Sequence, residues 1–156
     1  MISPELLRRY PFFAEQTDQQ LRTIAMIADE VSIEQGKTIF EEGEAAANFY
    51  LLIEGSVELY YRSQEEFYPK THKEFHVGDI NPGEIFAISA LIEPHVLNAT
   101  AKAAQPCRII KIDAVELRSA IDNDAQLGCR LMRQVAKAAK ERLAATRVLL
   151  AAASTP

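Results

Sequence analysis

Hydrophobic and polar positions divide the chain into two helical ends and a strand-rich middle. Near the N-terminus, Ser3-Pro4 is a typical helix start, and Thr17 with Gln20 forms a capping box that opens a second helix. Apolar side chains then recur at helical spacing along one face of that second helix. The pattern therefore predicts N-terminal helices within residues 1–30.

The middle of the chain, residues 31–112, alternates short apolar segments with glycines and turns. Residues 49–53 are continuously apolar, as in a strand that is covered on both faces. In the following strand, alternation predicts that Val57, Leu59 and Tyr61 point inward. Many short strands with regular turns are typical of a β-sandwich or a jelly roll.

A polar hairpin loop is expected over residues 62–70, and the last strand over residues 107–112. Asp113 and Glu116 have the spacing of a capping box at the start of a helix. A second and much longer helix is expected from Asn123-Asp124 to about residue 152.

The long C-terminal helix carries two apolar stripes. The first, formed by Leu127, Leu131 and Val135, is expected to pack on the β-rich part. The second has the alternating spacing of a coiled-coil seam and consists of Met132, Ala136, Ala139, Leu143, Thr146 and Leu150. A helix with both a core stripe and a seam predicts a homodimer through residues 124–152.

Together these elements predict a mainly β fold with flanking helices (α+β). We expect a double-stranded β-helix or jelly-roll barrel with N-terminal helices and a long C-terminal dimerisation helix. One domain is predicted over residues 1–152, with N-terminal helices in 1–30, the β-roll in 31–112 and C-terminal helices in 113–152. Residues 153–156 are expected to form a disordered tail.

Composition indicates an ordinary globular domain with one core, since 48% of the 156 residues are hydrophobic and 25% are charged. The net charge of −5 gives no support for a nucleic-acid partner. No apolar run approaches the ~20 residues of a membrane span. Cys107 and Cys129 are far apart and lack metal-type spacing, which favours a reduced, cytoplasmic protein.

The segment 80–103 is the most informative part of the chain. It begins with a Pro82-Gly83 turn, continues with an apolar stretch too short for a free-standing helix, and is then broken by a Glu-Pro pair. It resumes as an alternating strand, with Ala99 and Ala101 on one face and Thr100 on the other. Small side chains here predict a cradle in which a ligand can approach backbone N–H groups.

This segment resembles the phosphate-binding cassette of cyclic-nucleotide-binding domains, as found in effector domains similar to the catabolite activator. The residues that carry the resemblance are Ile80, Pro82, Gly83, Glu84, Phe86, Ala90, Leu91, Ala99 and Thr100. Upstream, residues 39–44 and 49–57 resemble the first two strand-and-glycine segments of the family. The resemblance covers nearly the whole chain and implies a regulatory domain that binds cAMP or cGMP.

Three positions depart from the cassette of the family. The cassette glycine is Ala87, the glutamate that binds the ribose hydroxyl is Ile88, and the arginine that binds the cyclic phosphate is Leu97. Two polar ligand contacts are therefore aliphatic in this chain. The resemblance implies the fold, whereas these departures predict weak or absent cAMP binding.

The resemblance also implies which residues line the ligand site. These are Phe86, Ala87, Ile88, Ser89, Ala90, Leu97, Asn98, Ala99, Thr100 and, from the long helix, Arg142. Arg142 lies near the place where the family's helix meets the purine ring, so it is a candidate contact for a ligand or a second subunit; alternatively it is a surface arginine. The DNA-binding members of the superfamily carry a helix-turn-helix after this helix, and this sequence shows no such module.

Two histidine-containing patterns suggest other chemistry. His72, Glu74 and His76 alternate on one strand face, but the two histidines would lie ~13 Å apart, too far for one metal ion. His95, in the cassette loop, is a candidate haem ligand, because a gas-sensing branch of the superfamily binds haem in this domain. Solvent-exposed histidines are the simpler interpretation of both patterns.

The sequence thus predicts a non-catalytic regulatory module for a small molecule, with an unidentified protein partner. It shows no readable nucleophile–base pattern and no glycine-rich strand-to-helix loop. A genuine cAMP- or cGMP-binding signalling domain with non-standard contacts is the alternative. A haem-type gas sensor and a cupin-like metalloprotein are further alternatives.

Overall fold

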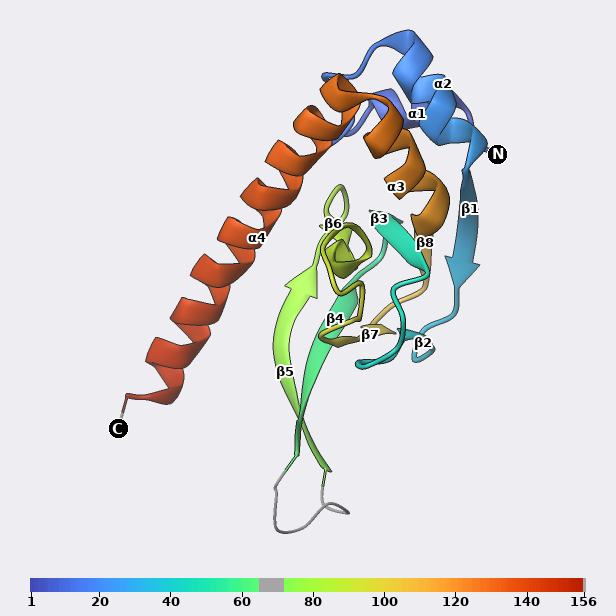
Figure 1. Ribbon diagram of the computed structural model, residues 1–156. Coiled ribbons are helices and arrows are strands. Elements are labelled where there is room, and N and C mark those ends of the chain that lie inside the picture. The colour runs from blue at the N-terminus through green and yellow to red at the C-terminus, as the bar shows by residue number, and fades with distance from the viewer. Residues whose placement is uncertain (65–71, 156) are drawn as a thin grey trace.

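The computed structural model describes residues 1–64 and 72–155, which form two facing sheets with helices at both chain ends (Figure 1). The helices are α1 (Pro4–Arg8), α2 (Asp18–Met26), the 3₁₀ turn η1 (Ile88–Leu91), α3 (Ala114–Asn123) and α4 (Ala125–Ala153). The strands are β1 (Ala28–Ile33), β2 (Thr38–Phe40), β3 (Asn48–Glu54), β4 (Val57–Gln64), β5 (His72–Ile80), β6 (Ile85–Phe86), β7 (Thr100–Ala103) and β8 (Cys107–Asp113).

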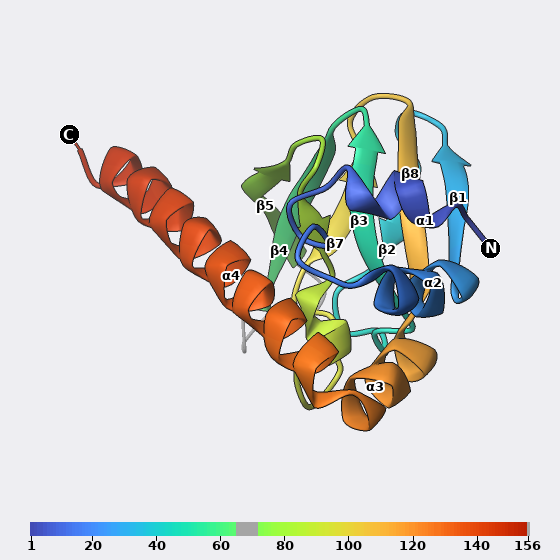
Figure 2. The ribbon, with the colours of Figure 1, turned by 90° about the horizontal axis from the view of Figure 1, so that it is seen from above.

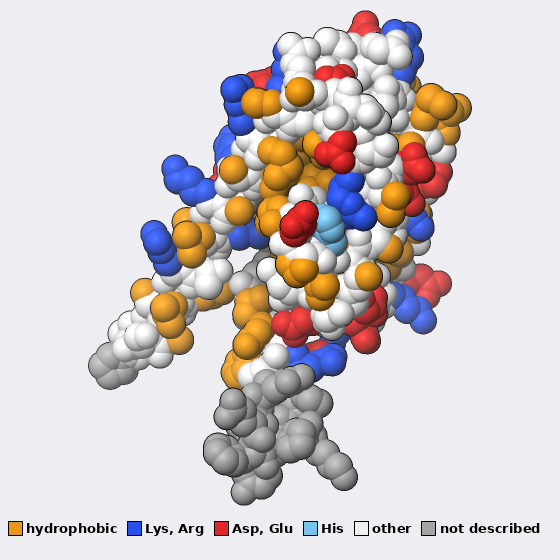
Figure 3. Space-filling model, viewed as in Figure 1, with side chains coloured by type: hydrophobic (Ala, Val, Ile, Leu, Met, Phe, Trp, Pro, Cys, Tyr) orange, Lys and Arg blue, Asp and Glu red, His pale blue; other side chains and the backbone are white. Residues whose placement is uncertain are grey.

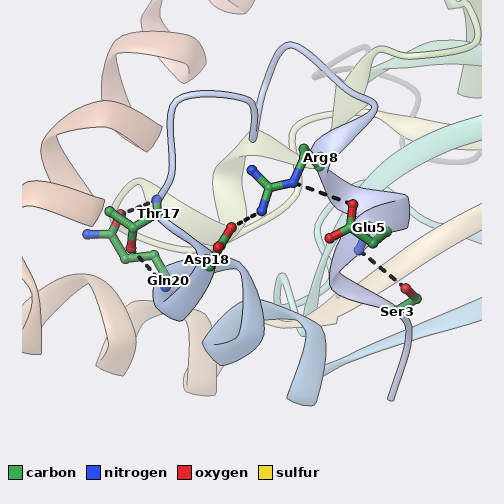
Figure 4. Close-up of polar contacts among 6 residues, drawn as sticks. All are labelled: Ser3, Glu5, Arg8, Thr17, Asp18 and Gln20. Carbon is green, nitrogen blue, oxygen red and sulfur yellow. Dashed lines mark hydrogen bonds and ion pairs between the residues drawn. The ribbon is translucent and has the colours of Figure 1, made fainter.

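The N-terminal helices begin where the cap residues predict (Figure 4). The Ser3 side chain accepts a hydrogen bond from the backbone two residues later, at 3.2 Å. Thr17 and Gln20 form the complete capping box, in which each side chain accepts from the backbone N–H of the other, at 3.2 and 2.9 Å. An ion pair between Arg8 and Asp18 ties α1 to the start of α2.

The two sheets have the strand orders β1-β8-β3-β6 and β2-β7-β4-β5, and all neighbouring strands are antiparallel. This confirms the predicted mainly β architecture with flanking helices. The sheets are not closed into a barrel, so the predicted closure is not observed.

Strands β3 and β8 lie side by side in the core. Residues 49–52 are all buried, as the continuous apolar run predicts, and Ile109, Ile110 and Ile112 of β8 are at most 1% exposed. The outer face of β3 is covered from the N-terminal segment, where the rings of Phe12 and Phe49 stack at 5.4 Å. Full burial of each such side chain contributes about 1.5–3 kcal/mol.

The β4–β5 hairpin differs from the sequence prediction. A β-bulge lies between Leu59 and Tyr60, and Tyr61, predicted to point inward, is 49% exposed. The strand also continues through Arg62 to Gln64, where a loop was predicted. The rest of that predicted loop, residues 65–70, lies outside the described residues.

The C-terminal helices follow from two aspartate caps. Asp113 accepts from the backbone N–H of Glu116 at 2.8 Å. The backbone N–H of Asp113 donates to Ile27 instead, at 3.1 Å, so the second half of the predicted capping box is replaced by a contact to the end of α2. Asp124 caps α4 by accepting from Leu127 at 3.1 Å.

Helix α4 is anchored at one end and projects at the other (Figure 2). Leu127, Leu131 and Val135 are buried against the domain, which confirms the predicted core stripe. The helix continues through Ala153, and Ser154 donates to the carbonyl of Leu150, so the start of the predicted disordered tail is ordered helix and cap.

The turn between β3 and β4 requires glycine at position 55. Gly55 has φ +102°, and a Cβ there would lie 2.5 Å from the carbonyl oxygen of Pro106. Gly36 also has a positive φ, +84°, but a Cβ there would meet nothing within 4 Å.

We therefore expect Gly55→Ala to lower the free energy of unfolding by clearly more than Gly36→Ala. Both variants carry the strain of a left-handed alanine, about 1–2 kcal/mol, and only Gly55→Ala adds a backbone clash. Urea unfolding of both variants and the parent measures the difference. If both variants lose the same free energy of unfolding, the backbone at Pro106 must move aside without an energetic penalty.

Candidate functional site

The predicted cradle starts with a tight turn that feeds a two-residue edge strand. Gly83 has φ +89°, and its N–H donates to the carbonyl of Leu52 at 2.7 Å. This contact places β6 beside β3, with Phe86 opposite Tyr50 and Ile85 opposite Leu51. The Pro-Gly signal thus fixes one end of the cradle against β3, whose residues 49–52 are buried.

Ala87 has a left-handed backbone, with φ 59° and ψ 45°, and it is the N-cap of η1. Its carbonyl accepts from the N–H of Ala90 at 3.0 Å, and both alanines are buried. Left-handed geometry favours glycine, and the family resemblance assigns the glycine of the cassette to Ala87. The assignments of Ile88 and Leu97 stay predictions.

Aromatic rings fill the space next to β6. The ring of Phe86 stacks on Tyr50 at 5.0 Å, and Phe40 lies 5.7 Å from Tyr50 and 6.1 Å from Phe86. Burial raises the pKa of Tyr50, and the nearby Glu44 carboxylate acts in the same direction. Sequence reasoning placed Phe86 in the site but missed its two aromatic partners.

Ile88 and Leu97, the two positions predicted to lack polar ligand contacts, are both in apolar surroundings. Ile88 is half-buried and packs against the core, whereas Leu97 is 5% exposed. Backbone hydrogen bonds hold Leu97 to Gly43 at 2.8 Å and to Glu44 at 2.9 Å. Its side chain lines a small pocket of about 150 Å³, together with Tyr50 and other residues of the β2–β3 segment.

The remaining cradle residues divide into two groups. Ser89, Asn98 and Ala99 are half-buried or exposed at the edge of the cradle. Thr100 is buried, and its hydroxyl accepts from the backbone N–H of Glu42 at 3.0 Å. Thr100 therefore stabilises the turn after β2. Its side chain lies on the face of β7 opposite the buried Ala101.

Arg142 reaches the domain surface from α4. It lines a pocket of about 130 Å³ with residues of the N-terminal segment and of the turn before β6. Its guanidinium donates to the carbonyl oxygen of Ile85. Burial lowers the pKa of Arg142, while the carboxylates of Glu84 and Glu141 act in the opposite direction. Arg142 thus contacts the chain itself next to the cradle, a role that sequence reasoning did not anticipate.

A second arginine supports the cradle from α3. Arg118 donates to the carbonyl of Ala90 at 2.7 Å and lines a pocket of about 320 Å³ that also contains His95. His95 has a left-handed backbone, with φ 59°. Sequence reasoning missed Arg118, because a lone arginine on an amphipathic helix gives no signal of its partner. The haem interpretation of His95 stays a prediction.

The alternating pattern on β5 is explained in part by ion pairs. Glu74 lies 3.0 Å from Lys102 and 3.6 Å from Arg62, and Lys102 is the main cause of the lowered pKa of Glu74. His76 is 2.7 Å from Asp79. Within residues 1–64 and 72–155, no three His, Cys, Asp or Glu side chains gather closely enough to hold a metal ion.

Helix α4 carries both charged and apolar side chains. Basic and apolar side chains alternate along its visible face (Figure 3). In the part of the chain that the structure describes, no helix is both long and apolar enough to cross a bilayer.

Comparisons with known proteins agree on one family. The family model for the cyclic nucleotide-binding domain matches residues 30–124. A solved structure from Geobacter metallireducens GS-15, described as a cyclic nucleotide-binding protein, is 42% identical, with a TM-score of 0.79. That match covers 92% of this chain and 99% of the other.

Two further relatives are described as a transcriptional regulator and a potassium channel protein. The N-terminal domain of a transcriptional regulator from Streptomyces coelicolor A3(2) is 25% identical, with a TM-score of 0.65, over 87% of this chain and 93% of the other. A protein of Rhodopseudomonas palustris, described as a potassium channel protein, is 23% identical over 131 residues. That match covers 84% of this chain but only 30% of the relative's length.

The backbone at position 87 predicts opposite effects for two glycine substitutions three residues apart. Ala87→Gly should raise the free energy of unfolding by about 1 kcal/mol, because it relieves a left-handed alanine. Ala90→Gly, at a fully buried position, should lower it by about 1–2 kcal/mol, since it removes a packed methyl group and helix propensity. Urea unfolding gives both values, and destabilisation by Ala87→Gly would contradict the left-handed assignment.

Proposed function

Because the chain belongs to the cyclic nucleotide-binding domain family, we propose that it is a non-catalytic regulatory module whose preferred ligand is not cAMP. The proposal rests on Ile88 and Leu97. These aliphatic residues occupy the two positions at which the family resemblance predicts polar contacts to the ligand. Leu97 is almost fully buried, so an anionic phosphate at this position would meet an apolar wall.

The energetic argument rests on lost charge-assisted contacts. Each hydrogen bond to a charged group contributes roughly 1.5–3 kcal/mol. A phosphate that enters without such partners loses its hydration without replacement, which is costly in an apolar site. The missing hydrogen bonds and the lost hydration of the phosphate both weaken the binding of cAMP and cGMP, compared with a site that has these polar contacts.

The cradle still offers features that suit a small molecule. The rings of Phe40, Tyr50 and Phe86 form an apolar cluster beside β6, and Ser89 and Asn98 add polar side chains to the cradle segment. We propose a ligand that is less anionic than a cyclic nucleotide and is bound through apolar contact and backbone groups. The cytoplasm is the proposed compartment, which suits the two free cysteines, Cys107 and Cys129.

Restoring the two polar side chains tests the assignment directly. The parent protein should bind cAMP weakly or not at all in calorimetry, and Ile88→Glu with Leu97→Arg should strengthen binding by roughly a hundredfold or more, the equivalent of two charge-assisted contacts. Arginine can contact the phosphate with two hydrogen bonds, and glutamate can accept from the ribose hydroxyl.

The two single variants serve as controls for this experiment. Each should bind more weakly than the double variant, because an unpaired charge in the pocket is costly and the effects are coupled. Thermal unfolding confirms that every variant is folded. Submicromolar cAMP affinity of the parent would refute the proposal, and a folded double variant that binds no better than the parent would refute the assignment of positions 88 and 97.

We also propose that the module works as a homodimer through α4. The support is the coiled-coil seam, whose members Leu143 and Leu150 are 52% and 65% exposed. Large apolar side chains at heptad spacing on a projecting helix are typical of an interface between copies. A paired helix would give the module a means to transmit a ligand signal to the protein it regulates.

A charged residue in the seam should separate the copies. Leu143→Asp places a carboxylate in the proposed interface, where an unpaired charge costs several kcal/mol. Light scattering after gel filtration should give a dimer for the parent and a monomer for this variant. Val148→Asp, an exposed site on the same helix but outside the seam, is the matched control and should stay dimeric. A monomeric parent at tens of micromolar would contradict the proposal.

A further inference from the structure

A pocket of about 320 Å³ lies between the loop that follows η1, helix α3 and the first turns of α4. It shares no residue with the site predicted for a cyclic nucleotide. Its volume is at the lower end of the range for small-molecule sites, which begins near ~300 Å³. Figure 3 shows histidine, acidic and basic side chains that gather around apolar ones on one face of the domain. The pocket is therefore large enough for a small molecule that carries polar groups.

Part of the pocket lining is apolar. Leu91 ends η1, Ile121 belongs to α3 and Met132 belongs to α4. All three side chains are half-buried and pack against the core, so part of each remains open to the pocket. An aliphatic group that covers them is favoured, because it removes apolar surface from water.

The guanidinium of Arg118 supplies positive charge at the pocket. It donates to the carbonyl of Ala90 at 2.7 Å, and this contact fixes where the group lies. A guanidinium has five N–H donors, so Arg118 keeps others for a ligand. The imidazole of His95 lines the same pocket and can donate in either protonation state. These two groups suit a carboxylate, which a guanidinium binds with two parallel hydrogen bonds.

The backbone holds His95 in a conformation that favours glycine. Its φ is 59°, its N–H donates to Ile92 at 3.0 Å, and its carbonyl accepts from Ala46 at 2.8 Å. Non-glycine residues in strained conformations cluster at ligand-binding sites. The conformation therefore supports a role for the imidazole at this pocket.

Two carboxylates line the pocket as well, those of Glu93 and Asp122. In the part of the chain that the structure describes, no ion pair within 4 Å involves Glu93, His95, Arg118 or Asp122. Acidic and basic groups that share a pocket without pairing can each contact one end of a ligand that carries both charges. The charges of the pocket thus complement a zwitterion.

We propose that this pocket binds an α-amino acid with an aliphatic side chain. Arg118 and His95 bind its carboxylate, Glu93 and Asp122 bind its ammonium group, and the aliphatic side chain packs on the three apolar residues of the lining. The inference goes beyond the proposed function, since it adds a second ligand site that does not depend on what the cradle binds.

Titration of the whole chain with L-leucine, followed by heteronuclear NMR, tests the proposal. The amide signals of residues 91–95 and 118–122 should shift together, and their titration gives the Kd. 3-Methylbutylamine, which is leucine without its carboxylate, should bind about tenfold more weakly. 4-Methylpentanoate, which is leucine without its amino group, should bind about threefold more weakly, because the acidic residues are exposed.

Side-chain variants place the ligand in the pocket. Arg118→Gln should weaken L-leucine binding about tenfold, and thermal unfolding checks that the loss of the contact to Ala90 leaves it folded. Glu93→Gln changes an exposed residue and should weaken binding about threefold. Arg133→Gln is the matched control and should bind as the parent does, because Arg133 is an exposed arginine of α4 that does not line the pocket.

Two further variants separate this site from the proposed function. Ile88→Glu with Leu97→Arg should bind L-leucine as the parent does, because neither position lines the pocket. Met132 also belongs to the proposed dimer seam, so the titration is repeated with Leu143→Asp. Binding by this variant alone would support the site and show that a second copy covers it.

Three results would overturn the inference. The first is that millimolar L-leucine shifts no signal in the parent or in Leu143→Asp. The second is that 4-methylpentanoate binds as tightly as L-leucine, since the acidic residues would then have no part in recognition. The third is that Arg118→Gln and Glu93→Gln both keep the affinity of the parent, which would place the ligand elsewhere.

Discussion

The burial of β3 and β8 on both faces is the constraint on which the other elements depend. A strand that is apolar on both faces needs cover on each, and here the second sheet lies on one side and the helical segments on the other. The order β8-β3-β6 then places the short β6 directly beside the core. The packing of the core therefore helps to position the cradle that follows β6.

Local signals in the sequence predict the elements well, because their causes lie within a few residues. The caps at Ser3, Thr17, Asp113 and Asp124 each act through a backbone group two or three residues away. The exposure of Tyr61 could not be predicted in this way. The pairing of β4 with β5 shifts register between Leu59 and Tyr60, and this irregularity depends on the partner strand. A bulge of this kind bends and twists the hairpin locally.

The candidate site also contains features that local sequence signals predict and contacts that depend on distant residues. The family resemblance assigned position 87, and the turn at Pro82-Gly83 could be recognised from residue types. The contacts of Arg118 with Ala90 and of Arg142 with Ile85 could not be recognised from the sequence. In both, the acceptor is a main-chain carbonyl far away in sequence, and a carbonyl leaves no mark in the amino-acid sequence.

The hydrogen bond from Arg142 to Ile85 has an evolutionary consequence. Every amino acid supplies the same carbonyl, so substitutions at position 85 or in the neighbouring cradle do not remove the acceptor. Only the arginine half of the contact is encoded by a side chain. The side chains of the cradle can therefore diverge while the attachment of the helix persists. Selection on ligand choice and selection on helix attachment then act on separate sets of residues.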